Sequence, residues 1–144
     1  MSALDERFSA ALHGAARQWR LLLDRRLRGL GMSQAGWMTI AIAAKAKAPL
    51  SQSELAASVG VEGATLVSML DRLARAGLVE RVPSDTDRRV KRVKVTAAGM
   101  ELYEQVKREG LAVRKELLAG VDPAALLAAT ELLEALGARL DEAV

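Results

Sequence analysis

The chain has no cysteine and a single histidine, His13, among its 144 residues. Disulfide bonds, thiolate zinc sites and cysteine-based oxidant sensing are therefore excluded, and no cluster of histidines is available for a metal ion. Aromatic residues make up only 3%, whereas alanine and leucine are abundant, so the composition favours helices over sheets. No apolar run approaches the roughly 18 residues that a membrane span needs.

Catalytic motifs are also missing. The sequence contains no glycine-rich phosphate loop, no grouping of Ser and Asp around His13 and no paired carboxylates in a recognisable pattern. We therefore predict that the protein is not an enzyme and needs no cofactor. The amino terminus MSALDERFSA lacks the pattern of a signal peptide, so we expect a soluble, cytoplasmic protein that does not bind membranes. Hydrophobic residues make up 51%, enough for the core of one domain.

Positive charge is concentrated in one stretch of the chain. The formal net charge of the whole chain is +3, but residues 72–94 alone hold eight Lys or Arg against three Asp or Glu. The last 23 residues hold five acids and one Arg, so they have the opposite sign. This polarity indicates that the basic stretch forms a surface for a polyanion.

Residues 51–77 have the pattern of two short helices. Ser51 and Glu54 form an S-x-x-E capping box at the start of SQSELAASVG, which closes at Gly60. GATLVSMLDRLARAG follows within three residues and ends at Gly77. Such a pair, with a glycine at the turn, predicts a helix-turn-helix.

The second short helix has two distinct faces. Leu66, Leu70, Leu73 and Ala74 form the predicted inward face, while Met69 lies at the margin of both faces. The opposite face carries hydroxyls near its amino-terminal end and arginines behind them, which suits insertion into a major groove of DNA. Its members are Thr65, Ser68, Arg72 and Arg75.

A basic hairpin follows the two helices. LVERV (78–82) and VKRVKV (90–95) are β-branched runs on either side of a turn cluster, so they predict two paired strands. Strand alternation turns Val93 and Val95 inward and Arg92 and Lys94 outward. Arg88 and Arg89 fall at the tip, where an arginine can enter a minor groove, and Asp87 is placed to orient Arg89.

These patterns together predict a winged helix-turn-helix that binds double-stranded DNA. The candidate DNA-binding residues come from the start of the first short helix, the outward face of the second and the hairpin. They are Ser51, Gln52, Ser53, Thr65, Ser68, Arg72, Arg75, Asp87, Arg88, Arg89, Lys91 and Arg92.

Longer helices flank this lobe. Apolar residues recur at steps of three and four over residues 4–30, and Ser33 caps a second, mostly apolar helix that ends before Pro49. Thr96 caps a helix over about 97–119, and Asp122 with Pro123 opens a last helix. The leucine-rich stripes of the two terminal helices are too large for one small lobe to cover, so we predict a homodimer.

The stretches LVSMLDRLARAG and GLVERVPSDTDRRVKRVKVTAAG resemble the MarR family of bacterial transcriptional regulators, and most of all its SlyA branch. The most specific parts are the D-R-R wing tip (residues 87–89) and the V-T-x-x-G that runs from Val95 to Gly99. The resemblance implies a mainly α fold with a small β-hairpin. It divides the single MarR-type domain into dimerisation helices (1–31 and 122–144), a winged helix-turn-helix (33–96) and a connecting helix (97–120).

The resemblance also implies a ligand. Many members of the family bind anionic aromatic compounds in a cleft between the dimerisation and DNA-binding lobes. The corresponding residues here are His13, Arg17, Trp37, Met38 and Ile42. Where SlyA-like recognition helices have an arginine, this chain has Ser68, which leaves the base preference at that position open.

The expected function is therefore a homodimeric, ligand-responsive transcriptional regulator, most often a repressor in this family, that binds a pseudopalindromic site and is released by a small aromatic carboxylate. Two alternatives stay open. One is a winged-helix module whose basic hairpin docks an acidic protein, and the other is an architectural DNA-binding protein without a ligand.

Overall fold

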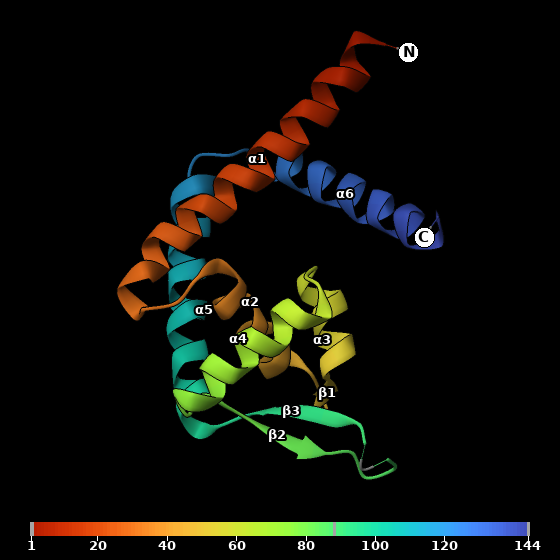
Figure 1. Cartoon of the computed structure of the whole chain (residues 1–144). Helices are drawn as coiled ribbons and strands as arrows, with labels where there is room; N and C mark the ends of the chain where they lie inside the picture. The colour runs from red at the N-terminus through yellow and green to blue at the C-terminus, as the bar shows by residue number, and fades with distance from the viewer. Residues whose placement is uncertain (1, 88, 144) are drawn as a thin grey trace. The chain divides into compact units, whose positions relative to one another are not determined.

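The computed structural model describes residues 2–87 and 89–143 (Figure 1). These residues are mostly helical and include one small antiparallel sheet, as the sequence predicts. The chain forms two compact units, residues 1–111 and 112–144. In chain order the elements are α1 (Ala3–Leu27), the 3-10 helix η1 (Arg28–Leu30), α2 (Gln34–Lys45), β1 (Leu50–Ser51), α3 (Gln52–Val59), α4 (Gly63–Arg75), β2 (Val79–Pro83), β3 (Lys91–Val95), α5 (Ala97–Leu118) and α6 (Pro123–Ala143).

The helix starts follow the capping residues that the sequence contains. The Ser33 hydroxyl accepts a hydrogen bond from the backbone N–H of Gly36 at 3.2 Å, and α2 begins there. At the start of α3 the Ser51 hydroxyl accepts from the Glu54 N–H, and the Glu54 carboxylate accepts from the Ser51 N–H, both at 3.1 Å. Gly60 ends α3 with φ of 82°, a conformation that favours glycine. The predicted capping box and turn glycine are confirmed.

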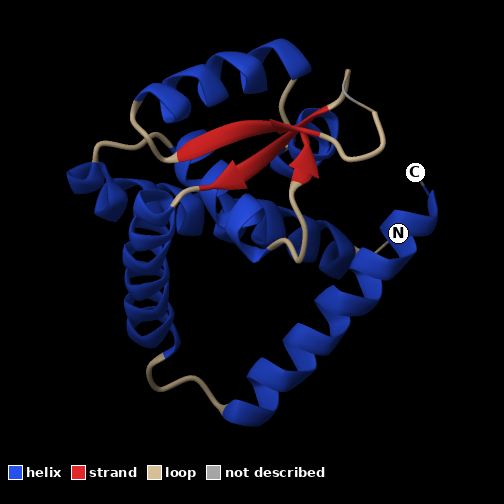
Figure 2. Ribbon diagram, turned by 90° about the horizontal axis from the view of Figure 1, so that it is seen from below, coloured by secondary structure: helices blue, strands red, loops and turns tan. Residues whose placement is uncertain are grey.

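The sheet has one strand more than the sequence predicts. β2 and β3 pair antiparallel with Val79 opposite Val95 and Pro83 opposite Lys91, which confirms the hairpin. On its other side β3 pairs with β1, so the strand order is β1-β3-β2, as Figure 2 shows. β1 has only two residues, Leu50 and Ser51, directly before α3. A strand so short has no alternating pattern, which is why sequence reasoning missed it.

The core of the first unit lies where α2, α3 and α4 meet the sheet. Ile40, Leu55, Leu70 and Val93 are at most 1% exposed and belong to one cluster of packed apolar side chains. Met69, which the sequence leaves between two faces, is buried in this cluster as well. The buried Thr39 hydroxyl donates to the Ala35 carbonyl at 2.7 Å, and its oxygen lies 3.7 Å from the Met69 sulfur, so α2 and α4 are in contact there.

The junction between β3 and α5 explains the V-T-x-x-G motif. The Thr96 hydroxyl donates to the Gly77 carbonyl at 2.6 Å and accepts from the Gly99 N–H at 3.1 Å. A Cβ on Gly99 would overlap the Leu78 carbonyl oxygen and lie 2.6 Å from Cγ1 of Val95. Thr96 therefore fixes the helix start, and only glycine fits where α5 approaches the strand.

The second unit consists of the end of α5 and helix α6. Asp122 accepts a hydrogen bond from the Ala124 N–H at 3.4 Å, and Pro123 is the first residue of α6, as predicted. Most leucines of α6 are exposed, with Leu127 at 59% and Leu140 at 64%, whereas Val113 on α5 is buried. Within the described part of the chain no helix is long and apolar enough to cross a membrane.

Candidate nucleic-acid interface

The outward face of α4 is exposed along its length. Thr65, Ser68, Arg72 and Arg75 are all exposed, while Leu66, Leu70 and Leu73 are buried on the opposite side. Ala74, predicted to face inward, is half-buried. Within the described residues, Arg75 is the one of these four whose side chain makes a hydrogen bond, from its Nε to the Asp71 carbonyl at 3.3 Å. Such a face, with short hydroxyls ahead of long cations, can reach both base edges and phosphates.

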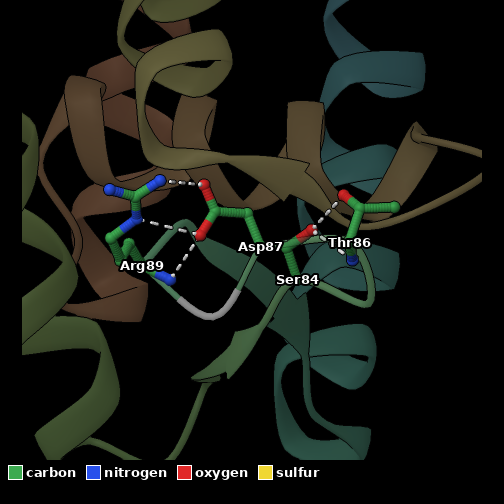
Figure 3. A network of polar contacts seen from close by, with 4 residues as sticks. All are labelled: Ser84, Thr86, Asp87 and Arg89. Atoms are coloured by element: carbon green, nitrogen blue, oxygen red, sulfur yellow. Dashed lines mark hydrogen bonds and ion pairs between the residues drawn. The ribbon is translucent and has the colours of Figure 1, made fainter.

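The turn between β2 and β3 is organised around Asp87 (Figure 3). Its carboxylate accepts from the backbone N–H of Arg89 at 3.0 Å and from the Arg89 Nε and Nη2 at 3.2 and 3.4 Å. These bonds lower the pKa of Asp87, the backbone N–H first and the guanidinium second. The Arg89 side chain is nevertheless 91% exposed, so it is held in one direction and still open to solvent. Arg88 lies outside the described residues.

A second small network supports the same turn. The Ser84 and Thr86 hydroxyls are hydrogen-bonded at 3.1 Å, and the Ser84 oxygen accepts from the Thr86 N–H at 3.3 Å (Figure 3). The backbone N–H of buried Ser84 donates to the Val90 carbonyl at 2.9 Å, which closes the hairpin end. The loop backbone beside Arg89 is therefore tied to both strands.

The two basic residues at the start of β3 differ in how far they are available. Lys91 is exposed and, among the described residues, has no ion-pair partner. Arg92 is half-buried, because its Nη1 donates to the Pro49 carbonyl at 2.9 Å and lies 3.8 Å from Glu54 Oε1. Strand alternation turns Arg92 away from Val93, as predicted, but part of its guanidinium is used to fasten β3 to the start of α3.

The start of α3 is likewise partly occupied within the fold. Ser51 serves as the helix cap, and its hydroxyl oxygen accepts from the Glu54 N–H. The Gln52 side-chain oxygen accepts from the Arg81 Nε at 2.8 Å. Ser53 is exposed. Of these three predicted DNA-binding residues, Ser53 alone has a side chain with no bond inside the described structure.

Sequence reasoning missed Arg81, which joins its own strand β2 to two helices, α3 and α4. Besides Gln52 on α3, its guanidinium reaches the Val67 carbonyl at 3.1 Å and Asp71 Oδ1 at 2.8 Å, both on α4. A usable signal was present, since Arg81 is two residues after Val79 and so shares the inward side of β2.

A pocket of about 310 Å³ opens beside α1 and α2. Of the predicted ligand residues it contains Arg17 and Met38, and it adds Arg20, Leu21, Gln34 and Val59. His13 is exposed on α1 and Ile42 packs on the core, so neither lines this pocket. Trp37 is half-buried, and its indole N–H is buried without a partner among the described residues. Helix spacing could have identified the two polar residues that were missed, because Arg20 lies three residues after Arg17 and Gln34 lies four residues before Met38.

Comparison with known proteins matches this chain to a protein family and to solved structures. The model of the MarR family matches residues 33–91. The crystal structure of transcriptional regulator PA3341 is 37% identical, covers 94% of this chain and 98% of its own, and superposes with a TM-score of 0.85. Wild-type MarR from E. coli is 26% identical over 89% of this chain and 95% of its own, with a TM-score of 0.78.

A third structure shares the fold. CouR from Rhodococcus jostii RHA1, solved with bound p-coumaroyl-CoA, is 20% identical over 94% of this chain and 95% of its own, with a TM-score of 0.79.

Proposed function

The chain belongs to the MarR family of DNA-binding transcriptional regulators, and we propose that it acts as a homodimeric repressor, of the SlyA-like kind, on a pseudopalindromic operator. The observation that carries the proposal is the exposed face of α4, with Thr65 and Ser68 ahead of Arg72 and Arg75. In a winged helix-turn-helix this face enters the major groove, and the hairpin tip reaches the flanking minor groove.

The proposed contacts divide into two kinds. Thr65, Ser68 and Arg72 face the base edges and supply sequence preference. Ser51, Ser53, Arg75, Lys91 and the free part of Arg92 contact phosphates, and Gln52 lies beside them. Arg89, oriented by Asp87 and joined by Arg88, enters the minor groove. Phosphate contacts of this number give the affinity a steep dependence on salt concentration.

The proposed dimer uses the first 31 residues and residues 122–144, with 97–120 connecting them to the winged lobe of 33–96. The support for it is the exposed apolar surface of α6, whose large side chains would be covered by a second copy. A two-fold dimer presents two α4 helices to half-sites about one helical turn apart. This arrangement explains why the operator should be a pseudopalindrome.

The proposed effector is a small aromatic carboxylate. The pocket beside α1 and α2 is lined by the cationic residues Arg17 and Arg20 together with the apolar residues Leu21, Met38 and Val59. This combination suits an anionic head and an apolar ring. A ligand there would favour one spacing of the two winged lobes, and an operator of fixed half-site separation binds one spacing best.

One set of experiments tests the proposal. Sequences bound by the protein are selected from random DNA, and binding to the selected site is measured over a salt series and mapped by footprinting. We expect a two-fold symmetric footprint and an affinity that falls steeply with salt. Retention without a symmetric footprint would favour an architectural protein, and no retention would favour a protein-docking module.

The ligand is tested separately. A panel of benzoate and hydroxycinnamate derivatives is added to the complex of the protein with the selected DNA site. Binding of each derivative is followed through the fluorescence of Trp19 on α1 and Trp37 on α2. We expect release by some members and loss of that release in Arg20→Ala. A reporter gene placed behind the selected site should be silenced by the protein, and an increase in expression would show an activator instead.

A further inference from the structure

Arg81 is a cation in the basic stretch whose side chain points into the fold. It lies on β2 directly opposite the buried Val93 and two residues after the buried Val79. Its Nε donates to Gln52 on α3, and its Nη2 donates to the Val67 carbonyl and pairs with Asp71 on α4. Its side chain is 26% exposed, far less than that of Arg89 at the wing tip. Of its donors, those on Nε and Nη2 are therefore used within the protein.

We propose that Arg81 is a positioning residue for DNA recognition, which locks the recognition helix α4 to α3 and to the base of the wing. The inference rests on the proposed function, because it assigns a role in operator binding. DNA recognition needs the α4 face and the wing tip to meet two different grooves at the same time. The bonds of Arg81 join β2, the first strand of that wing, to the middle of α4, and so fix the offset between the two contacts.

The geometry requires an arginine. The three acceptors belong to a side-chain amide, a backbone carbonyl and a carboxylate, and they lie around one planar group. A guanidinium presents its N–H donors in a rigid fork, whereas the ammonium of lysine is a single point on a flexible stem. A lysine at position 81 would keep the charge but could not hold α3 and α4 together in this way.

The partial exposure of the ion pair between Arg81 and Asp71 determines how much it contributes to stability and how much to the orientation of α4. Asp71 is 47% exposed, so water screens the ion pair and its effect on global stability is small. The effect on the orientation of α4 is larger. Asp71 lies one turn after Val67 on the same helix, so Arg81 bonds to α4 at two successive turns. Loss of Arg81 should therefore lower discrimination between the operator and other sequences more than it lowers stability.

The test compares Arg81→Met with Asp71→Asn and with the double variant. For each protein, affinities for the selected operator and for random DNA are measured over a salt series. We expect Arg81→Met to reduce the ratio of the two affinities about tenfold, and Asp71→Asn to reduce it less, because the bonds of Arg81 to Gln52 and Val67 remain. The double variant should be no worse than Arg81→Met, because Asp71→Asn removes only a contact that Arg81→Met has already removed. Arg81→Lys should not restore the ratio.

The salt series separates positioning from phosphate binding. A residue that neutralises a phosphate changes the slope of log affinity against log salt by about 0.9 when it is removed. Arg81→Met should leave this slope unchanged. A slope reduced by about that amount, additive losses in the double variant or an unchanged ratio would each overturn the proposal.

A measurement without DNA tests the lock itself. Because the chain has no cysteine, nitroxide labels can be placed at two introduced cysteines, Ser68→Cys on α4 and Asp85→Cys in the wing turn. Pulsed electron resonance then gives the distribution of distances between them. We expect a narrow distribution that broadens in Arg81→Met, and equal widths would overturn the proposal. Failure of the unaltered protein to bind any DNA would instead overturn the proposed function.

The control for simple destabilisation is Val106→Ala. Val106 is buried on α5, and it is not among the polar partners of Arg81 in the described structure. This variant should lower the melting temperature at least as much as Arg81→Met and yet keep the ratio of specific to random binding. If it lowered the ratio equally, the effect of Arg81 would be one of stability alone, and the positioning role would be wrong.

Discussion

Asp87 and Arg89 in the turn between β2 and β3 are joined by three bonds, one from the backbone N–H of Arg89 and two from its guanidinium. The Asp87 carboxylate thus stabilises the turn through the backbone of Arg89 and orients the Arg89 guanidinium at the same time (Figure 3). The arginine remains open to solvent, so the pair presents the charge without burying it.

The wing arginine should contribute directly to operator binding. Arg89→Ala is expected to weaken binding to the selected operator about tenfold or more, and to leave the dimer intact. Asp87→Asn keeps the arginine and weakens its orientation, so its loss should be smaller, less than about fivefold. Electrophoretic mobility shift and sedimentation measure the two quantities. Equal affinity of Arg89→Ala and the unaltered protein would remove the wing tip from the mechanism.

The capping box of α3 should make stability depend on pH in the acid range. Hydrogen bonds from the Ser51 backbone first and its hydroxyl second, with a smaller effect of Arg92, lower the pKa of Glu54. The unfolded chain therefore takes up this proton at a higher pH than the folded one, so the contribution is complete above the ordinary glutamate pKa of about 4.3 and is lost as pH falls through the lower folded value.

The melting temperature of Glu54→Gln, measured from about pH 7 to pH 3, should lie below that of the unaltered protein at neutral pH and meet it at the acid end. Glu62→Gln removes the same charge from the start of α4, where the side chain makes no capping bond, and serves as the control. Parallel curves for Glu54→Gln and the unaltered protein would show that the carboxylate charge contributes nothing at this cap.

Gly99 should be intolerant of any side chain. Gly99→Ala places a Cβ against the Leu78 carbonyl and Val95, and the strand and helix must separate to admit it. We expect a loss of at least about 1 kcal/mol in the free energy of unfolding, measured by urea titration. Gly63→Ala, where a Cβ meets nothing within 4 Å, is the matched control and should not be destabilised. A stable Gly99→Ala would mean that the β3–α5 junction is looser than described.

The exposed leucines of α6 should hold the dimer. A double variant, Leu127→Glu with Leu140→Glu, is expected to sediment as a monomer and to lose most of its affinity for a two-half-site operator, because charges cannot be buried without partners. Glu131→Gln on the same helix is the control and should remain a dimer. A double variant that still sediments as a dimer would place the interface elsewhere.

The local features of the winged lobe could be predicted because each is carried by neighbouring residues. Ser51 with Glu54, Gly60, and Thr96 with Gly99 act within a few residues of one another, and the structure has all of them in place. The period of the leucines in α4 and of the valines in β3 likewise gave the buried faces. For Asp87 and Arg89 the spacing of two residues was enough to predict the pair.

The chain by itself determined the capped helices, the hairpin, the concentration of positive charge and the family to which it belongs, since all of these are written in short stretches. Tertiary structure decided which cations remain free. Arg81 and Arg92 look like Arg89 in the sequence, but their guanidinium groups bond to Asp71, Gln52 and Pro49, residues 10 to 43 positions away. A side chain's partners depend on what folding brings beside it, and no local pattern contains that information.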